Sequence, residues 1–320
     1  MGSGPAAAVH AQALRQNRAF RLHGVASRNR SRALALARRF GAPAFSSPRQ
    51  LIREPSTQAV ILAVPPAVQP GYLREALRRG IPVLCEKPLA LTGQAARQAL
   101  RAARVKPSAA GINFCYRLIP EIAWFRECVR RRVVGTPWQI QVEWILGNRL
   151  GRKIKKLPAW KQAEDQGGGV LMNYGIHVLD YLFAGLPGPR LAGSDWHRRG
   201  NSKATEAGTM TWCLPDGSAT IRLSLIARRT PTHRIRLEGP FGSVKVENSS
   251  PRNPAGPFRI STQGNGRWPK RLPSSTASLP GLFQKVHEHW ERAIRKKSNH
   301  IPTVAEGLRA LLLTKKALSP

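Results

Sequence analysis

The alternation of short apolar runs with helix-forming segments in the first hundred residues most constrains the fold of this chain. Ala59–Val64 is an apolar run that ends at Pro65, and Pro82–Cys85 is a second one. Continuous apolar runs of this length are typical of parallel strands buried on both faces. Helical patterns separate the runs and end at Gly41 and Gly80. The pattern therefore predicts β-α units around a parallel sheet.

The hydrophobic pattern changes near Gly135, from β-α units to the alternation typical of antiparallel strands. Before it, we expect strands at Phe20–Ala26, Ala59–Val64, Pro82–Cys85 and Ser108–Phe114, and helices at Pro5–Arg15, Ser31–Phe40, Val68–Arg79, Thr92–Arg104 and Pro120–Arg132. After it, we expect a strand at Trp138–Ile145, hairpins at Met210–Ala227 and Arg234–Val246, loops over Ser249–Pro280, and helices at Val170–Leu182, Leu282–Lys297 and Thr303–Leu318. The prediction is an α/β Rossmann-like domain over residues 1–134, followed by an α+β domain with a mostly antiparallel open sheet over residues 135–320.

The charge is the least ordinary property of the composition. The chain has 52 Lys and Arg against 17 Asp and Glu, a formal net charge of +35. Such a charge favours polyanions and anionic substrates. The basic clusters fall in different predicted elements: Arg130–Arg132, Lys153–Lys156, Arg228–Arg229, Lys270–Arg271 and Arg295–Lys297. Because no single basic stripe is visible, we expect nucleic acid to bind only nonspecifically.

The sequence argues against a membrane span, a secretory signal, a disulfide framework and a metal site. No apolar run approaches the roughly 20 residues of a membrane span, and the amino terminus has no secretory pattern, so we expect a cytoplasmic protein. The four cysteines are widely spaced and contain no Cys-x-x-Cys pair, which argues against a zinc site and a disulfide framework. His287 and His289 are two apart on a predicted helix, so their rings splay apart; we expect no metal site and a solvated surface there.

Gly2, Gly4 and Ala7 match the G-x-G-x-x-G/A pattern, whose small residues allow a pyrophosphate to approach a helix start. By itself the match is as typical of a flexible tail. A predicted strand at Phe20–Ala26 favours the dinucleotide site. The strand that should precede the glycines is absent, so either the start is assigned too late or the domain lacks its central strand.

Ser27 and Arg28 occupy the region about 20 residues beyond the glycines. An acidic residue at this place accepts hydrogen bonds from the ribose of NAD. A hydroxyl and a guanidinium are better suited to a 2′-phosphate, so we expect NADP rather than NAD. The alternative is that both are turn residues on an arginine-rich surface.

Lys87 and His177 are the candidate catalytic residues. Lys87 follows a predicted buried strand, although most lysines are simply exposed. His177 is four residues after Asn173, which places both on one face of a helix, although a lone histidine on such a helix is usually structural.

Three motifs in this order resemble the glucose–fructose oxidoreductase, inositol dehydrogenase and MocA-like (Gfo/Idh/MocA) family of NAD(P)-dependent oxidoreductases. They are the glycine turn, Glu86-Lys87-Pro88, and Gly167–Gly169 followed by Asn173, Gly175, His177 and Asp180. The resemblance extends to Ala63–Pro66 with Gln69 and to Asn113–Arg117 with Pro120. In the family the lysine lies beside the nicotinamide, the Lys-Pro bond is typically cis, and the histidine acts as acid/base. Asn173 departs from the pattern, since the family has aspartate there; an amide cannot stabilise an imidazolium by charge.

The resemblance implies roles for a wider set of residues. Those expected to act in catalysis are Lys87, His177 and Asn173. Those expected to bind the coenzyme are Gly2, Ser3, Gly4, Ala6, Ser27, Arg28, Val64, Pro65, Gln69, Glu86 and Lys87. Those expected to bind substrate are Tyr116, Arg117, Asn173, Tyr174 and His177.

The sequence therefore predicts an NADP-dependent enzyme that moves hydride between the nicotinamide and a secondary alcohol or carbonyl of a sugar or polyol. We also expect a homo-oligomer, since the open sheet often forms the subunit contact in relatives. Two alternatives remain open at this point: a catalytically weak binding or regulatory protein that keeps the fold, and a polyanion-binding protein.

Overall fold

The computed structural model describes residues 1–105, 109–146, 163–198, 204–225, 231–248, 250, 253, 255–270, 278–296 and 301–319. The chain divides into two compact units. Unit 1 contains residues 1–115 and 279–311, and unit 2 contains residues 116–278 and 312–320. The sequence predicts a single domain boundary after residue 134. In the structure the chain passes from unit 1 to unit 2 after residue 115, returns to unit 1 after residue 278, and enters unit 2 again after residue 311.

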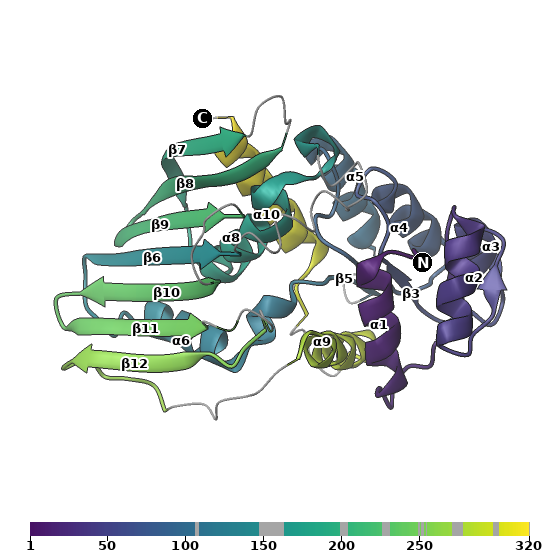
Figure 1. Cartoon of the computed structure of the whole chain (residues 1–320), viewed down its shortest axis with the longest axis horizontal. Coiled ribbons are helices and arrows are strands. Elements are labelled where there is room, and N and C mark those ends of the chain that lie inside the picture. The colour runs from purple at the N-terminus through teal and green to yellow at the C-terminus, as the bar shows by residue number, and fades with distance from the viewer. Residues whose placement is uncertain are drawn as a thin grey trace. The chain divides into compact units, whose positions relative to one another are not determined.

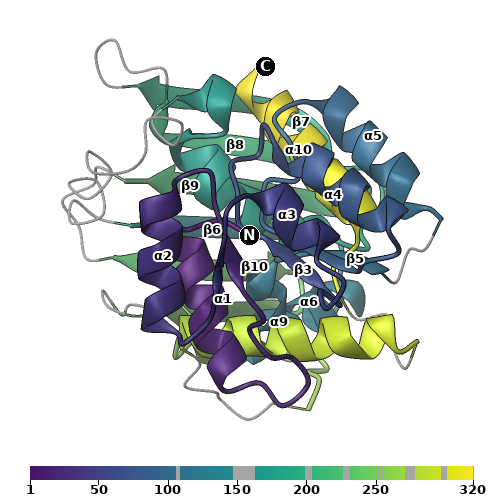
Figure 2. The same ribbon diagram turned by 90° about the vertical axis from the view of Figure 1, so that its right-hand side faces the viewer.

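Unit 1 is built from β-α repeats (Figures 1 and 2). Its strands are β1 (Val25–Ala26), β2 (Ala44–Phe45), β3 (Val60–Leu62), β4 (Val83–Cys85) and β5 (Ala110–Ile112). Its helices are α1 (Pro5–Arg15), α2 (Arg30–Arg39), α3 (Pro48–Arg53), α4 (Gln69–Arg78), α5 (Gly93–Ala103) and α9 (Leu279–Ile294), and α10 (Val304–Leu318) starts there. The strands pair in parallel within two sheets, in the orders β1-β2 and β3-β4-β5, which confirms the Rossmann-like prediction.

The backbone of Met1 and Gly2 joins these two sheets. Gly2 N–H donates to the carbonyl of Ala26 in β1 (2.8 Å), and Ala63 N–H donates to the carbonyl of Met1 (2.8 Å). The two residues therefore occupy the position between β1 and β3, where the central strand of the predicted fold belongs. Gly2 has a positive φ of 106°, and a Cβ there would lie 2.1 Å from the Ala63 carbonyl oxygen, so this position requires glycine.

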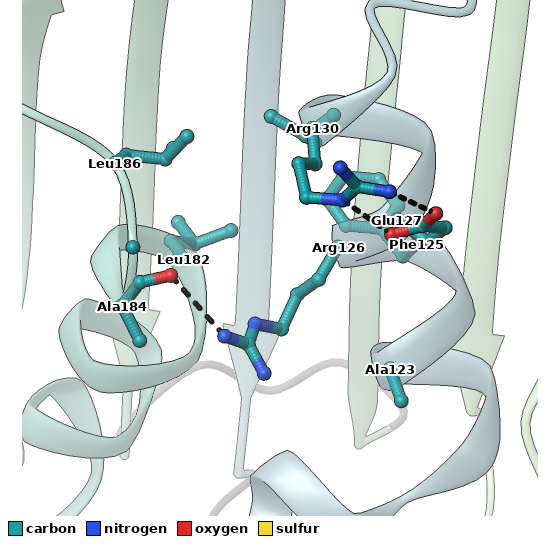
Figure 3. A pocket seen from close by; sticks show the side chains of 10 residues that line it. Ala123, Phe125, Arg126, Glu127, Arg130, Leu182, Ala184 and Leu186 are labelled. Atoms are coloured by element: carbon teal, nitrogen blue, oxygen red, sulfur yellow. Dashed lines mark hydrogen bonds and ion pairs between the residues drawn. The ribbon is translucent and has the colours of Figure 1, made fainter.

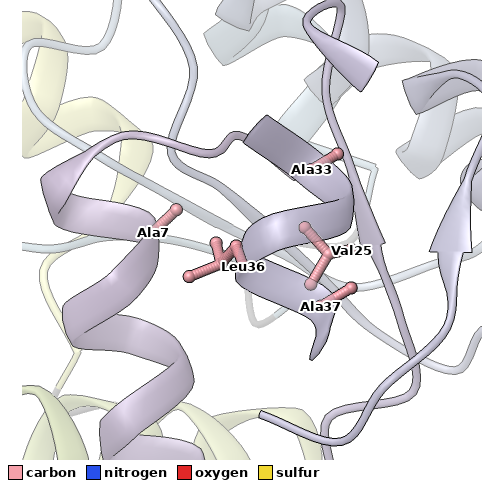
Figure 4. Packing of buried hydrophobic residues seen from close by; sticks show 5 residues of the cluster. All are labelled: Ala7, Val25, Ala33, Leu36 and Ala37. Atoms are coloured by element: carbon pink, nitrogen blue, oxygen red, sulfur yellow. The ribbon is translucent and has the colours of Figure 1, made fainter. Parts of the chain in front are cut away.

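A small hydrophobic cluster holds α1 and α2 against β1 (Figure 4). Ala7 and Ala33 present only methyl groups, and they pack with Val25, Leu36 and Ala37. Because small side chains let helix and strand backbones approach closely, Ala7 serves the packing role of the third small residue in the glycine pattern.

Unit 2 is a seven-stranded sheet with helices on one side (Figure 1). The strand order is β12-β11-β10-β6-β9-β8-β7, and every neighbouring pair is antiparallel except β6 and β9. The bounds are β6 (Trp138–Ile145), β7 (Arg190–Arg198), β8 (Thr205–Leu214), β9 (Gly217–Ser224), β10 (Thr232–Gly239), β11 (Gly242–Asn248) and β12 (Arg259–Gly264). The helix α6 (Pro120–Arg130) packs against β11 and against α8 (Ile176–Phe183). This confirms the α+β prediction for the second half.

Several sequence predictions differ from the structure in detail. The strand expected at Phe20–Ala26 is only Val25–Ala26, and β12 forms in the segment expected to be loops, because its backbone pairs with β11. The elements β2, α3 and β7 have no counterpart in the prediction. None of the described helices is long and apolar enough to cross a membrane.

Candidate active site

Lys87 lies directly after β4, at the carboxyl end of the buried strand, as the sequence predicts. The Lys87–Pro88 bond is cis. Gln69, at the first position of α4, holds this loop: its amide nitrogen lies 2.6 Å from the carbonyl oxygen of Glu86, 3.0 Å from that of Pro88 and 3.1 Å from that of Leu89. Gln69 is 1% exposed. Its side chain therefore supports the backbone that presents Lys87, and direct contact of Gln69 with the coenzyme stays a prediction.

The carboxylate of Glu86 is the centre of a buried polar network in unit 1. Asn113 Nδ2 donates to Glu86 Oε1 (2.6 Å), and His10 Nε2 lies 3.0 Å from the same oxygen. His10 Nδ1 in turn lies 2.9 Å from His287 Nε2, on α9. Although burial works against the ionised form, hydrogen bonds from His10 and Asn113 and the charge of Lys87 lower the pKa of Glu86. The carboxylate thus ties α1, the strand end and α9 together.

The network also fixes the position of one imidazole proton. A carboxylate oxygen only accepts, so His10 Nε2 must carry a proton. Burial, with a contribution from His10, lowers the pKa of His287 to about 2, so His287 stays neutral at physiological pH. The expectation that His287 lies on a solvated surface is wrong, because the side chain is fully buried, at 0% exposure, between α9 and α1.

The glycine turn and the Ser27 region meet within unit 1. Gly4 precedes α1, whose first turn contains no acidic residue and no side-chain cap. The Ser3 hydroxyl donates to Ser27 Oγ (2.9 Å), and Ser27 Oγ accepts the Asn29 N–H (3.3 Å). Arg28 is exposed beside them. The uncapped helix start leaves backbone N–H groups for an anion, and a Cβ added at Gly4 would meet only open space, so these residues fit a pyrophosphate.

The remaining predicted coenzyme residues also belong to unit 1. Val64 and Pro65 follow β3, and Ala6 is in the first turn of α1.

His177 lies in α8 of unit 2 and is 6% exposed. Its ring packs against that of Tyr116, with centroids 4.9 Å apart. One turn later, Asp180 receives a bidentate pair of hydrogen bonds from Arg117, at 2.7 Å from Nε and 2.5 Å from Nη2. The motif ending in Asp180 and the motif containing Arg117 thus meet in an ion pair that holds α8, so the Arg117 guanidinium has a structural partner whatever its role toward substrate.

Asn173 does not lie on a regular helix. The segment Leu171–Gly175 is a π-helical turn before α8, where the sequence predicts continuous α-helix. A Cβ on Gly175 would lie 2.4 Å from Leu171 Cδ1 and 2.7 Å from Leu223 Cδ1, so a larger residue here would require both leucine side chains to shift. The Asn173 amide nitrogen donates to the Gly169 carbonyl (2.8 Å), which engages one of the donors expected to reach substrate.

An aromatic cluster that the sequence analysis missed surrounds these residues. Trp144 and His233 stack with centroids 4.1 Å apart, and Tyr174 lies edge-on to Trp144 at 5.5 Å. His233 Nε2 pairs with the Tyr181 hydroxyl (2.9 Å). Burial lowers the pKa of His233 to about 3 and raises that of Tyr174 to about 12, so the imidazole is neutral and the phenol protonated at physiological pH. The alternation in Trp138–Ile145 marks Trp144 as inward-facing, but no local signal pairs it with His233.

A cavity of about 270 Å³ also lies in unit 2, between α6 and the end of α8 (Figure 3). Arg126 donates to the Ala184 carbonyl across it (3.1 Å), and Glu127 on its wall is bound by Arg130. It contains none of the predicted site residues.

Within unit 1 the structure joins the glycine turn to Ser27, and it joins α1 to the Lys87 loop through His10 and Glu86. Within unit 2 it gathers Tyr116, Arg117, Tyr174 and His177. Lys87 belongs to unit 1 and His177 to unit 2. Their meeting beside a bound coenzyme stays a prediction.

A glycine turn at a helix start beside parallel strands, joined to an open α+β sheet, is the architecture of a dinucleotide-fold oxidoreductase. Residues 1–114 match the family described as "Oxidoreductase family, NAD-binding Rossmann fold", and residues 126–318 match its "C-terminal alpha/beta domain". The chain belongs to the Gfo/Idh/MocA oxidoreductase family, as the motifs indicate.

Individual relatives agree with this assignment. An uncharacterized oxidoreductase of Synechocystis is 24% identical over 98% of this chain and 90% of its own length. The inositol 2-dehydrogenase of Rubrobacter xylanophilus is 33% identical over 43% of this chain and 40% of its own length. The D-glucoside 3-dehydrogenase of Escherichia coli is 29% identical over 54% of this chain and 48% of its own length, so these two matches span half of the relatives or less.

Solved structures support the fold over the whole chain. The WlbA dehydrogenase from Bordetella pertussis, in complex with NADH and UDP-GlcNAcA, has a TM-score of 0.83 at 16% identity and covers 99% of this chain and 92% of its own. Levoglucosan dehydrogenase, in complex with NADH and levoglucosan, has a TM-score of 0.81 at 17% identity, with 99% and 94% covered.

Proposed function

We propose that this protein is an NADP(H)-dependent oxidoreductase that transfers hydride between the nicotinamide and a secondary alcohol or carbonyl of a sugar or polyol. The observation that carries the proposal is the Lys87 loop. It lies at the carboxyl end of a buried parallel strand and is held by Gln69 and Glu86 in the unit that contains the glycine turn. A cation presented in this way is suited to stabilise developing alkoxide charge.

The coenzyme would be held by residues that the structure brings close to one another. The amides of Ser3, Gly4 and Ala6 would bind the pyrophosphate, and Gly2, whose N–H already donates to the Ala26 carbonyl, would form the tight turn that lets the phosphates approach. Ser27 and Arg28 would bind a 2′-phosphate. When bound, the nicotinamide supplies the carbon that accepts or donates hydride. Val64 and Pro65 would line its side of the site.

The remaining roles belong to protein groups in unit 2. His177 would take the proton of the substrate hydroxyl or return it. Arg117 would act chiefly through its ion pair with Asp180, which holds α8 and thereby the position of His177. Tyr174, kept protonated by burial, is a second candidate acid. Asn173 and Tyr116 would position the substrate.

Relatives support the substrate class but leave the coenzyme open. The names of matched proteins include inositol, D-glucoside and glucose-6-phosphate dehydrogenases. Two neighbouring structures contain NADH rather than NADPH. Our preference for NADP depends on Arg28 and on the lack of an acid near Ser27.

The open face of the seven-stranded sheet supports a homo-oligomer. Charged residues of this face form ion pairs with one another: Glu143 lies between Arg222 (3.8 Å) and Arg234 (3.3 Å), and Lys245 pairs with Glu247 (3.4 Å). Because a molecule of net charge +35 repels its copies, a face whose charges are already paired is the favourable place for self-association. A cytoplasmic location stays a prediction.

A fluorescence titration with NADPH and NADH at moderate salt tests the coenzyme. We expect tighter binding of NADPH, and we expect Arg28→Ala to remove at least tenfold of that preference, the size of a lost charge-assisted hydrogen bond. Arg38→Ala, at the far end of α2, is the matched control and should change neither affinity. Preference for NADH in the unaltered protein would contradict the NADP assignment.

Turnover with a panel of sugars and polyols tests the reaction. We expect Lys87→Met to abolish measurable turnover while coenzyme still binds. Coenzyme binding without turnover in the unaltered protein would favour the catalytically weak alternative, for which the amide of Asn173 in place of a carboxylate is the supporting observation.

A further inference from the structure

The outer helices of unit 1 carry an unusual concentration of arginine. Residues 1–115 contain 18 Lys and Arg but only three acids, Glu54, Glu75 and Glu86. Glu86 is buried in the His10 network, and Glu75 lies between Arg49 (3.4 Å) and Arg53 (3.9 Å). Little negative charge is left to neutralise the rest.

Tertiary packing brings these arginines onto one surface. Helix α3 packs beside α4 and α4 beside α5, and Figure 2 shows the three helices next to one another. We call the basic residues of these helices and their C-caps the arginine surface: Arg49, Arg53, Arg74, Arg78, Arg79, Arg97, Arg101 and Arg104. The same positions contain two acids, Glu75 on α4 and Glu54 at the C-cap of α3.

The arginines form rows along the helices. Arg97 and Arg101 are four residues apart on α5, Arg104 follows three later, and Arg74 and Arg78 are four apart on α4, so each set shares a face. The three of α5 are exposed, and among the described residues they have no acidic partner. Like charges at this spacing destabilise a helix by a few tenths of a kcal/mol per pair. Helix dipoles account for basic residues near the carboxyl ends, but not for Arg97 in the first half of α5.

We propose that the arginine surface binds the phosphate backbone of double-stranded nucleic acid without regard to base sequence. Guanidinium groups bind phosphate oxygens in bidentate pairs, and every charged residue of these helices and their C-caps besides Glu54 and Glu75 is arginine. Neighbouring helix axes lie about 8–10 Å apart, so rows on adjacent helices can reach phosphates on both sides of a groove about 12 Å wide.

The absence of aromatic platforms points to duplex rather than single strands. Helices α3 and α5 contain no aromatic residue, and α4 contains only the half-buried Tyr72. Single-stranded nucleic acid is held largely by bases stacked on aromatic rings. This surface offers charge without stacking, which suits paired strands whose bases are already stacked.

The test separates this surface from the general charge of the molecule. Binding of a fluorescein-labelled 20-bp DNA duplex is followed by anisotropy from 50 to 300 mM salt, with full-length protein. The triple variant Arg78→Gln, Arg97→Gln and Arg101→Gln is compared with a control triple, Arg190→Gln, Arg259→Gln and Lys316→Gln. The control residues are exposed, lie in unit 2 and remove the same three charges.

We expect the unaltered protein to bind duplex with a Kd of about 1 to 100 μM at 150 mM salt, the range of nonspecific binding. The surface triple should weaken binding by roughly tenfold or more and lower the slope of log K against log salt by about 2.7, since each phosphate contact contributes about 0.9. The control triple should change affinity by less than about threefold. Circular dichroism and coenzyme titration confirm that both triples are folded.

Further arms identify the ligand. A double-stranded RNA of the same length should also bind, since it offers phosphodiesters, but less tightly than DNA because its major groove is narrow. A single strand should bind more weakly than the DNA duplex. Equal losses in the two triples, no loss in the surface triple, tighter binding of single strands, or tighter binding of vesicles containing anionic lipid than of duplex would each overturn the proposal. None of these outcomes depends on whether the protein is an oxidoreductase.

Discussion

The two units stabilise their buried polar groups in different ways. In unit 1 a single carboxylate, that of Glu86, accepts hydrogen bonds from His10 and Asn113, which come from distant parts of the chain. In unit 2 a buried ion pair, Arg117 with Asp180, lies one turn from His177. His233, a buried histidine of unit 2, stacks on Trp144 and pairs with the Tyr181 hydroxyl.

The difference teaches how each unit positions its candidate catalytic side chain. The Glu86 network connects α1, the end of β4 and α9. Because several hydrogen bonds stabilise the Lys87 loop, we expect the loss of any one of them to have a limited effect on its position. The ion pair of unit 2 is concentrated in two residues next to His177. We therefore expect unit 2 to be more sensitive to a single change, and the predictions below test that contrast.

The largest expected effect is that of Asp180→Ala. It removes the carboxylate that pairs with the buried Arg117 guanidinium, and breaking such a pair costs about 3–5 kcal/mol of unfolding free energy. Urea denaturation measures the loss, and Asp195→Ala, on exposed β7, is the control, expected to change stability by less than about 0.5 kcal/mol. A loss below 1 kcal/mol for Asp180→Ala would show that the pair is not what holds α8.

The second effect is acid destabilisation through the buried histidines. Their folded pKa values, about 3 for His233 and about 2 for His287, lie below the unfolded value of 6.5. The unfolded chain therefore binds more protons, and stability is full above pH 6.5 and lost as pH falls toward the folded values. At pH 5 each histidine should cost about 2 kcal/mol.

Hydrogen exchange at pH 7 and pH 5, read separately for each unit, measures this loss. His233→Phe should make unit 2 less sensitive to acid, and His287→Phe should do the same for unit 1. Equal acid sensitivity in the variants and the unaltered protein would contradict the neutral, buried state of these rings.

The third effect is that of Glu86→Gln, which keeps the shape of the side chain but removes its charge. Because Asn113 and His10 both donate to one oxygen, we expect a loss of about 1–3 kcal/mol in unit 1. If the enzyme turns over, kcat should fall more than KM rises, since Lys87 loses its neighbouring carboxylate. Glu54→Gln, half-buried on the same unit, is the control. A loss as large as that of Asp180→Ala would remove the contrast between the units.

The smallest effect is that of Gln69→Leu, which withdraws the donor shared by three carbonyls of the Lys87 loop. We expect about 1–2 kcal/mol. Gln98→Leu, which removes only a long contact with Arg74 (3.4 Å), should be nearly neutral. Thermal melts of both variants provide the measurement, and identical melting temperatures would mean that the loop does not need the amide.

Much of the fold could be predicted from the sequence because it depends on local patterns. The apolar runs ending at Pro65 and Glu86 became β3 and β4, and the alternation in Trp138–Ile145 became β6. Short strands such as β2, and β12 with its mostly exposed residues, could not be predicted, since their pairing partners rather than their composition create them. The π-helical turn before His177 likewise depends on how Gly175 packs on β9.

The candidate site shows the same division. The positions of Lys87, His177 and the glycine turn, and with them the family, followed from motif order alone, because those residues are close in sequence to the turns and strand ends that present them. Only the tertiary structure decided which distant residues became partners. It pairs His10 with Glu86 and His287, joins Arg117 to Asp180, and brings the arginines of α3, α4 and α5 onto neighbouring helices. Local patterns record which face of an element is buried, but a hydrogen bond between residues 76 or 277 positions apart depends on where the whole chain places its helices.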